Sequence, residues 1–380
     1  MDFSLTKEQE MIKKLAGQFA LEVLETVAAE LDESHTFPIE NFKKMAALGF
    51  TGIGVPREYG GTGGGAIEEV IAVNEFAKKC MSSSAILSIH LIAPHAINKF
   101  GNEEQKQKYL PRLTKGGELG AFALTEPNAG SDAGAVKTVA ILDEDTNEYV
   151  INGTKCFISG GSRADILTLF ALTQPEKGLK GMSAIIIEKG TPGFSIGKIE
   201  SKMGLAGSET AELIFEDCRV PASNLLGKEG QGFKIAMQAL DGARIGTGAQ
   251  AVGVAEGALD LSVKYAKERV QFGKPIGTLQ GIQWYIADMA TKTESAKMLV
   301  YYAAYLKDAG KAHTKESAMC KLNASENARH VTNMALQIHG GYGYMKDYPL
   351  ERMYRDAKIT EIYEGTSEIH KVVIAREVMK

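Results

Sequence analysis

Apolar residues recur at helical spacing through the first third of the chain. Between residues 6 and 30 they share one face, with charged residues on the other. Thr6, followed by Glu8 and Gln9, supplies the chemistry of an N-terminal helix cap. The same spacing predicts further helices over residues 39–48, 66–79, 81–98 and 103–115, with a glycine-rich break at 56–65. We therefore expect an α-helical N-terminal domain over residues 1–118.

The pattern changes near Gly120, where short runs of alternating or β-branched residues replace the helical spacing. These runs predict strands over residues 149–151, 156–158, 166–172 and 184–187. Asn152-Gly153 lies between apolar residues and favours a hairpin with a type I′ turn. We expect an antiparallel sheet from about residue 120, in a middle β domain over residues 119–226.

Helical spacing returns for the last third of the chain. It predicts long helices over residues 232–269, 279–310 and 315–338, and a final segment after Thr366. Small residues crowd positions 242–257, which would let helices approach closely. This indicates a C-terminal helical bundle domain over residues 227–380. Helices, then a sheet, then helices predict an α+β fold and not the strand–helix alternation of a doubly wound fold.

Composition narrows the class of protein. Hydrophobic residues make up 44% and charged residues 24%, as in soluble globular proteins. The net charge of −4 gives no general footprint for nucleic acid. No apolar run approaches the ~20 residues that a membrane span needs. The acidic start of the chain lacks the features of a signal or transit peptide. The four cysteines lie far apart, which fits reduced thiols, so we expect a cytoplasmic protein.

The sequence contains neither a functional dinucleotide-binding motif nor a zinc-binding motif. Residues 61–66 spell a dinucleotide-binding fingerprint, but no buried strand precedes them, so we interpret them as a turn between helices. His90 and His95 are five residues apart, which places them off one helical face, and no zinc-binding H-E-x-x-H occurs. We therefore expect no metal site.

Three glycine-bearing segments carry the candidate chemistry. They cover residues 123–132, 337–344 and 362–368, and each is rich in hydroxyl groups and backbone donors beside a regular element. Such loops suit a polar ligand with phosphates and ring heteroatoms. Any one of them alone is equally well explained as an ordinary capped turn.

Together, and with residues 268–275 between them, these segments resemble the acyl-CoA dehydrogenases. The resemblance covers essentially the whole chain, including Glu58-Tyr59-Gly60-Gly61 near its start and Arg355-Asp356-Ala357-Lys358-Ile359 near its end. The sequences of these motifs are most similar to those of the short-chain, butyryl-type members. The resemblance implies an α-helical N-terminal domain, a middle β-barrel and a C-terminal four-helix bundle. It also implies FAD, a homotetramer, and electron exchange with an electron-transferring flavoprotein.

The family reaction removes an α-proton and a β-hydride from an acyl thioester. Glu364 resembles the family's base, and a water-poor pocket would raise its pKa toward the operating pH. Gly365 would let the thioester approach closely. Some members carry the base on the helix that holds residues 241–244; the corresponding residue here is Ala243, which cannot abstract a proton.

The resemblance also implies the binding residues. Those expected at the flavin ring are Phe122, Leu124, Thr125, Ser131, Phe157, Ile158 and Ser159. Those expected at the ADP half are Arg269, Phe272, Gln280, Gln337, Gly340, Gly341, Thr366 and Glu368, with Arg269 and Gln280 supplied by a neighbouring subunit. Those expected at the thioester are Ser131, Asp241, Arg244, Tyr363 and Gly365. Arg244 would also steady the Glu364 loop, or else form an intrahelical surface pair.

Substrate size stays open at this point. Ile86 and Leu87 could block a long acyl tail and favour C4-type groups, or they could simply pack the core. Ser82, Ser83 and Ser84 could instead open a wider pocket for an aryl-enoyl thioester. A flavin-binding electron relay without thioester chemistry is a third hypothesis. The sequence does not determine whether dehydrogenation or enoyl reduction is the physiological direction.

Overall fold

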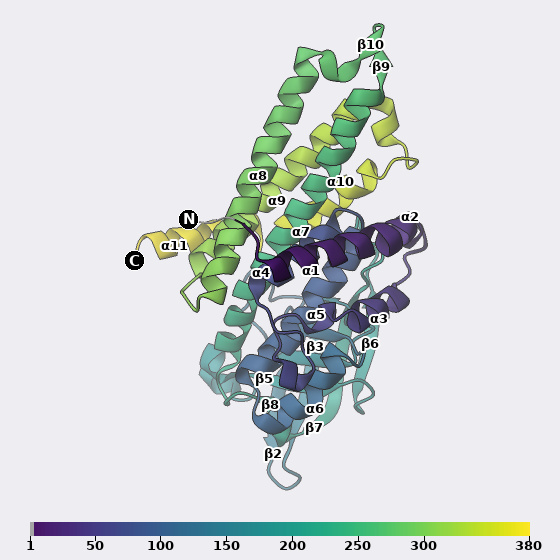
Figure 1. Cartoon of the computed structure of the whole chain (residues 1–380). Helices are drawn as coiled ribbons and strands as arrows, with labels where there is room; N and C mark the ends of the chain where they lie inside the picture. The colour runs from purple at the N-terminus through teal and green to yellow at the C-terminus, as the bar shows by residue number, and fades with distance from the viewer. Residues whose placement is uncertain (1–3) are drawn as a thin grey trace.

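The computed structural model describes residues 4–380; the first three residues of the acidic N-terminal segment lie outside this range. Figure 1 shows most of the β-strands gathered at one end of the molecule and the long C-terminal helices extending away from them, with the short strands β9 (Val270–Gln271) and β10 (Lys274–Pro275) at the far end. The N-terminal helices pack against both parts. This arrangement confirms the predicted α+β order of helices, sheet and helices.

The N-terminal helices follow the predicted positions. Helix α1 (Lys7–Phe19) continues through a π-helical turn at Ala20–Leu24 into α2 (Glu25–Ser34), so the first helical segment is longer than expected. The predicted cap is present, because the Gln9 backbone N–H donates to Thr6 Oγ1 at 3.2 Å. The remaining helices are α3 (Ile39–Ala47), α4 (Ala66–Ala77), α5 (Met81–Phe100) and α6 (Glu103–Thr114).

One eight-stranded sheet occupies the middle of the chain. Its strands are β1 (Gly120–Ala123), β2 (Val139–Asp143), β3 (Glu148–Ser159), β4 (Ile166–Leu172), β5 (Met182–Glu188), β6 (Phe194–Ile199), β7 (Thr210–Pro221) and β8 (Leu225–Leu226). The order is β6-β7-β3-β2-β4-β5-β8, and β1 also pairs with β4. The expected antiparallel sheet is in fact mixed, because β1 and β2 both run parallel to β4.

The hairpin expected at Asn152-Gly153 is wrong. Strand β3 runs straight through this position, with a register shift against β7 between Ile151 and Gly153. A side chain at Gly153 would lie 2.5 Å from Thr138 Oγ1, so glycine is needed here for close packing. The turn between β2 and β3 instead falls at residues 144–147. Pairing along the long β3–β7 ladder outweighs the local turn preference.

The C-terminal helices are α7 (Gly232–Glu268), α8 (Gln280–Asp308), α9 (Thr314–His339), α10 (Leu350–Lys358) and α11 (Ser367–Val378). Only α10 was not predicted. Strands β9 (Val270–Gln271) and β10 (Lys274–Pro275) form a small hairpin between α7 and α8. The small residues of α7 do permit close packing: a Cβ at Gly253 would lie 2.4 Å from the Asn74 carbonyl oxygen of α4.

The two histidines of α5 serve packing. His90 is buried, with Nδ1 accepting from the Gly120 N–H at 3.0 Å, and His95 Nε2 lies 2.8 Å from the Ile53 carbonyl oxygen. Residues 61–66 form a loop and the first turn of α4. Within residues 4–380, no cluster of metal-ligating side chains occurs, and no helix is long and apolar enough to cross a membrane. The domain limits at 118/119 and 226/227 stay predictions.

Candidate active site

A cavity of about 630 Å³ lies where the sheet meets the helices. Its walls come from α5, from β1 and the loop after it, from the end of β3, from the segment between β6 and β7, from α7, and from α10 and the loop between α10 and α11. Among the residues that the sequence singled out, it brings together Phe122, Leu124, Thr125, Ser131, Phe157, Ile158, Ser159, Arg244, Tyr363, Glu364, Gly365 and Thr366. Residues as far apart in the sequence as Phe122 and Thr366 thus line one cavity.

Glu364 is held in an unusual conformation at this wall. Its φ of +56° and the φ of +100° at Gly365 place both residues in the left-handed region, where a non-glycine residue is strained by about 1–3 kcal/mol. Its Oε2 atom is buried and has no hydrogen-bond partner among the described residues. Burial raises the pKa of the Glu364 carboxyl, while the charges of Arg244 and Lys321 oppose that rise. A buried, unpaired carboxylate of this kind is suited to accept a proton.

Four contacts fix the loop that bears Glu364. The Tyr363 hydroxyl donates to the side-chain oxygen of Gln250 on α7. Arg244 Nε lies 3.5 Å from the Glu364 carbonyl oxygen. Lys321 Nζ donates to the Gly365 carbonyl at 2.5 Å. Thr366 then caps α11, since its side chain accepts from the Ile369 N–H.

Arg244 is not a surface residue. Its side chain is buried, and its NH1 group pairs with Asp241 at 2.7 Å. The other carboxylate oxygen of Asp241 accepts from the Thr314 hydroxyl at 2.6 Å. The intrahelical pair considered above therefore exists, but it is buried and turns the guanidinium toward the Glu364 loop.

The part of the lining that comes from β1, β3 and the loop after β1 has features that fit an isoalloxazine ring. Phe157 adopts φ +57°, and 64% of its surface is exposed, while Thr125 and Ser159 line the same cavity with hydroxyl groups. The loop after β1 is anchored by a buried ion pair. Lys155 Nζ lies 2.7 Å from Glu126 Oε1 and donates to the Leu124 carbonyl at 2.9 Å. An exposed aromatic side chain, hydroxyl donors and a rigid loop on the same cavity as the unpaired carboxylate fit a bound flavin.

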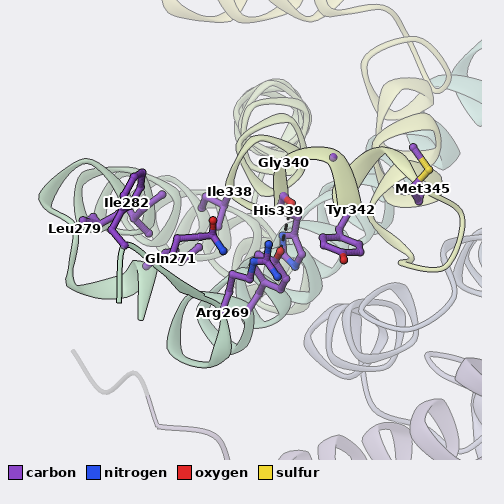
Figure 2. Close-up of a pocket in the computed structure, with 13 residues that line it drawn as sticks. Arg269, Gln271, Leu279, Ile282, Ile338, His339, Gly340, Tyr342 and Met345 are labelled. Atoms are coloured by element: carbon purple, nitrogen blue, oxygen red, sulfur yellow. Dashed lines mark hydrogen bonds between the residues drawn. The ribbon is translucent and has the colours of Figure 1, made fainter. Parts of the chain in front are cut away.

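A second cavity, of about 580 Å³, lies at the β9–β10 end of the long helices. It contains four of the residues expected at the ADP half, namely Arg269, Phe272, Gly340 and Gly341. Figure 2 shows Arg269 beside Tyr342 and His339, and its guanidinium lies 5.4 Å from the centre of the Tyr342 ring. The two cavities have no lining residue in common within the described chain. The expected cofactor residues are therefore divided between two places on one chain.

The remaining predicted binding residues line neither cavity. Gln280, Gln337 and Glu368 are exposed, and Asp241 lies beside the first cavity only through its pair with Arg244. Their predicted roles stay predictions.

The residues expected to limit acyl length do not line the cavity. Ile86 and Leu87 are buried in the helical core, as the core-packing alternative held. Of the serines, Ser84 donates to the Val73 carbonyl and Ser83 contacts the Cys80 thiol. The apolar lining comes instead from Ile89 and Ile92 on α5 and from Met237 and Leu240 on α7. The prediction that α5 lines the cavity is confirmed, but only the tertiary packing shows which face of α5 does so.

Sequence reasoning also missed Lys321. Its signal is present in the sequence: Ser317, Cys320, Lys321, Ala324 and Ser325 follow helical spacing along α9, and all are buried. A lysine in a stripe of otherwise small residues is unusual, because a buried charge is costly unless it is paired.

Comparison with known proteins matches three family models in succession. They are the N-terminal domain of acyl-CoA dehydrogenase over residues 6–144, the middle domain over 121–218 and the C-terminal domain over 230–379. The chain is 81% identical to the acryloyl-CoA reductase (NADH) of Anaerotignum propionicum, over 100% of this chain and 96% of that protein.

Two solved structures show the same fold over 100% of both chains. Butyryl-CoA dehydrogenase from Megasphaera elsdenii matches with a TM-score of 0.98 and 46% identity. A chain from a structure described as the electron transferring flavoprotein of Acidaminococcus fermentans, in work on flavin-based electron bifurcation, matches with a TM-score of 0.98 and 51% identity. The chain therefore belongs to the acyl-CoA dehydrogenase family, whose members are FAD-dependent oxidoreductases acting on CH–CH bonds.

Proposed function

We propose that this protein interconverts a short-chain acyl-CoA and its α,β-enoyl thioester, using FAD and exchanging electrons with an electron-transferring flavoprotein. The observation that carries the proposal is the buried, unpaired carboxylate of Glu364, which lies on the same cavity as Thr125 and Ser159. This geometry supports a thioester held between a base and a flavin.

In this proposal Glu364 takes the α-proton during dehydrogenation and returns it during enoyl reduction. The bound FAD supplies the acceptor or donor of the β-hydride. The Glu364 backbone N–H stabilises the charge that develops on the thioester carbonyl. Gly365 lets the thioester lie close to the loop, since no side chain projects there. The apolar walls exclude water, which keeps the carboxylate reactive.

Cations around the cavity favour an anionic ligand such as a CoA thioester. Lys202, Arg244, Arg355 and Lys358 all line it, against the carboxylates of Glu200 and Glu364. Arg355 is held by Asp32 and Glu351, so it is positioned rather than mobile. We infer that Ser131, Tyr363 and the Asp241–Arg244 pair contact the thioester.

The apolar lining supports a short acyl group of three or four carbons. Ile89 and Ile92 on α5 and Met237 and Leu240 on α7 line the cavity where these two helices pack together, and we infer that they close it against a longer acyl tail. The 81%-identical relative is named for acryloyl-CoA, a three-carbon enoyl thioester, which favours the reductive direction. The serines of α5 form contacts in the protein interior, and this removes the reason to prefer an aryl-enoyl substrate.

Substituting Ile92→Ala should shift preference toward longer thioesters. The change removes three carbons from the cavity wall, and each buried methylene contributes about 0.8 kcal/mol. We expect kcat/KM for C6 relative to C4 thioesters to rise about tenfold. The matched control is Ile86→Ala on the same helix, which opens the core and not the cavity. An equal shift in both variants would contradict this assignment of the acyl end.

We further propose a homotetramer in the cytoplasm. One chain separates Thr125 and Ser159 from Arg269, Gly340 and Gly341, so a single FAD would contact both sets only if another copy brought its second cavity to the first. Phe272, which is exposed and lines this second cavity, is suited to such a contact. All four cysteines are buried free thiols, which fits a reducing compartment.

The direct test is the absorbance of the purified yellow protein. Butyryl-CoA or propionyl-CoA should bleach the flavin, and a reduced electron-transferring flavoprotein with crotonyl-CoA or acryloyl-CoA should give turnover. Comparing turnover of a cinnamoyl thioester with turnover of crotonyl-CoA tests for an aryl substrate, and a clear preference for crotonyl-CoA counts against one. Absorbance that stays fully oxidised with every saturated C3–C8 thioester, together with no enoyl reduction, would refute the proposal.

A further inference from the structure

We propose that Lys321 is a positioning residue for this reaction: it holds the Gly365 carbonyl and places a positive charge behind Glu364, so that the base is fixed and its carboxylate form is favoured. The inference rests on the proposed function and deepens its account of the same site.

Two buried cations bind consecutive carbonyl groups of the loop. Lys321 on α9 donates to the Gly365 carbonyl, and Arg244 on α7 lies against the Glu364 carbonyl. The Lys321 side chain is 0% exposed. Both loop residues have positive φ, and a strained loop persists only where its surroundings over-determine it. Two cations on two different helices therefore act as a clamp on the residue that bears the carboxylate.

The surroundings of Lys321 contain no ion pair that would account for its burial. Its one hydrogen bond among the described contacts goes to Gly365, and no carboxylate lies within ion-pair distance of Nζ within the described chain. The His370 ring on α11 lies beside Gly365, and its two ring nitrogens have no hydrogen-bond partner among the described residues. Burial lowers the pKa of His370 to about 3, so this imidazole is neutral and adds no positive charge beside Glu364.

The charges around Lys321 and Glu364 determine whether Lys321 raises or lowers the pKa of Glu364. The ionisable groups facing Lys321 or Glu364 are Asp241 and Arg244 on α7, Glu361 before the loop, Tyr363 within it, and Glu368 and His370 on α11. Burial lowers the pKa of Lys321 to about 7, and Glu364 is the largest of the influences that oppose this. Below about pH 7 the lysine is charged and favours the carboxylate of Glu364. Removing the charge should raise the pKa of Glu364 further.

The test compares three substitutions in the flavin-loaded protein. Lys321→Met removes charge and donor, Lys321→Gln keeps a donor without the charge, and Lys321→Arg keeps both. The first readout is an infrared titration of the Glu364 carboxyl without thioester, with the band identified by its loss in Glu364→Gln. The second is the pH profile of kcat/KM. Lys78→Met is the matched control, because Lys78 is largely buried in an ion-pair network with Glu75 and Glu256 away from the cavity.

We expect Lys321→Met to move the Glu364 titration and the acidic limb of kcat/KM upward by about one pH unit. Its kcat should fall about 10- to 100-fold with little change in KM, since the base is displaced and not the binding site. Lys321→Gln should show the same shift with a smaller loss of kcat. Lys321→Arg keeps its charge above pH 7, so Glu364 should titrate at or below its wild-type pKa.

Unchanged titration in Lys321→Met, or equal shifts in the Met and Arg variants, would overturn the inference. If Lys321→Met does not fold, the Gln and Arg variants decide in the same way. A wild-type protein that fails to react with any thioester would refute the proposed function alone, because the infrared titration still reports on Lys321.

Discussion

Replacing Glu364 with Gln should abolish most thioester chemistry while leaving the flavin bound. The amide keeps the size of the side chain but cannot accept the α-proton. General acid–base groups typically contribute 10²–10⁴-fold, so we expect kcat to fall by at least about 10²-fold. Flavin content and absorbance should match the wild type, because the flavin-facing residues are untouched. Stopped-flow bleaching by butyryl-CoA measures the effect.

Glu200→Gln is the matched control, because Glu200 also lines the cavity but its carboxylate pairs with Lys198 at 2.6 Å. It should keep turnover within a few-fold of the wild type. Near-normal turnover of Glu364→Gln would mean that another group is the base. Loss of bleaching in Glu364→Gln also separates thioester chemistry from a simple electron relay, which needs no base.

The second large effect should come from Lys155→Met, and it should appear in stability. Lys155 is 0% exposed and Glu126 is 6% exposed, so the substitution leaves a buried carboxylate without its cation. Breaking a buried pair from one side costs about 3–5 kcal/mol. We expect the urea midpoint of the flavin-loaded protein to fall accordingly, and flavin to dissociate more readily, because the same lysine holds the Leu124 carbonyl.

The loss of stability in Lys155→Met should depend on pH because Glu126 is ionisable. Burial opposes its ionisation, but Lys155 and the backbone donors of Lys137 and Thr138 outweigh burial and lower its pKa. The stabilisation is therefore present above the usual carboxyl pKa and is lost as the pH falls through the lowered value. The difference between wild type and Lys155→Met should shrink in acid.

Lys155→Met combined with Glu126→Gln should recover part of the stability, since no buried charge is left alone. Lys198→Met is the exposed control; its pair with Glu200 should contribute at most about 1 kcal/mol. If Lys155→Met and Lys198→Met unfolded at the same urea concentration, the buried Lys155–Glu126 pair would not have the stabilising role proposed for it.

Local patterns predicted the helices well because their burial repeats along the chain. Helices α4 to α6 and α7 to α9 begin and end within a few residues of the expected limits. The hairpin at Asn152-Gly153 failed because β3 pairs with β7 over a long ladder, and turn chemistry there serves a bulge. Helix α10 was missed because it is short and lies inside a loop-rich stretch.

The candidate base was identified from its motif, and the structure places Glu364 on the same cavity as Thr125 and Ser159. Its environment was not visible in the sequence. The left-handed loop, the raised pKa and the clamp of Arg244 and Lys321 all depend on helices α7 and α9 meeting behind the loop. The residues at the acyl end of the cavity could not be identified from the sequence either. Only the packing shows that Ile89 and Ile92 line the cavity and that Ile86 and Leu87 do not.

Short-range spacing along the chain predicted the order of helices and strands, and the motifs, through their resemblance to a known family, indicated the family and the residues that carry the chemistry. Only the tertiary structure decided which faces of those elements meet. It divided the expected cofactor residues between two cavities, buried one carboxylate without a partner, and set a lysine against the neighbouring carbonyl. Desolvation and charge act through space, so contacts between distant segments establish the chemical properties of the site.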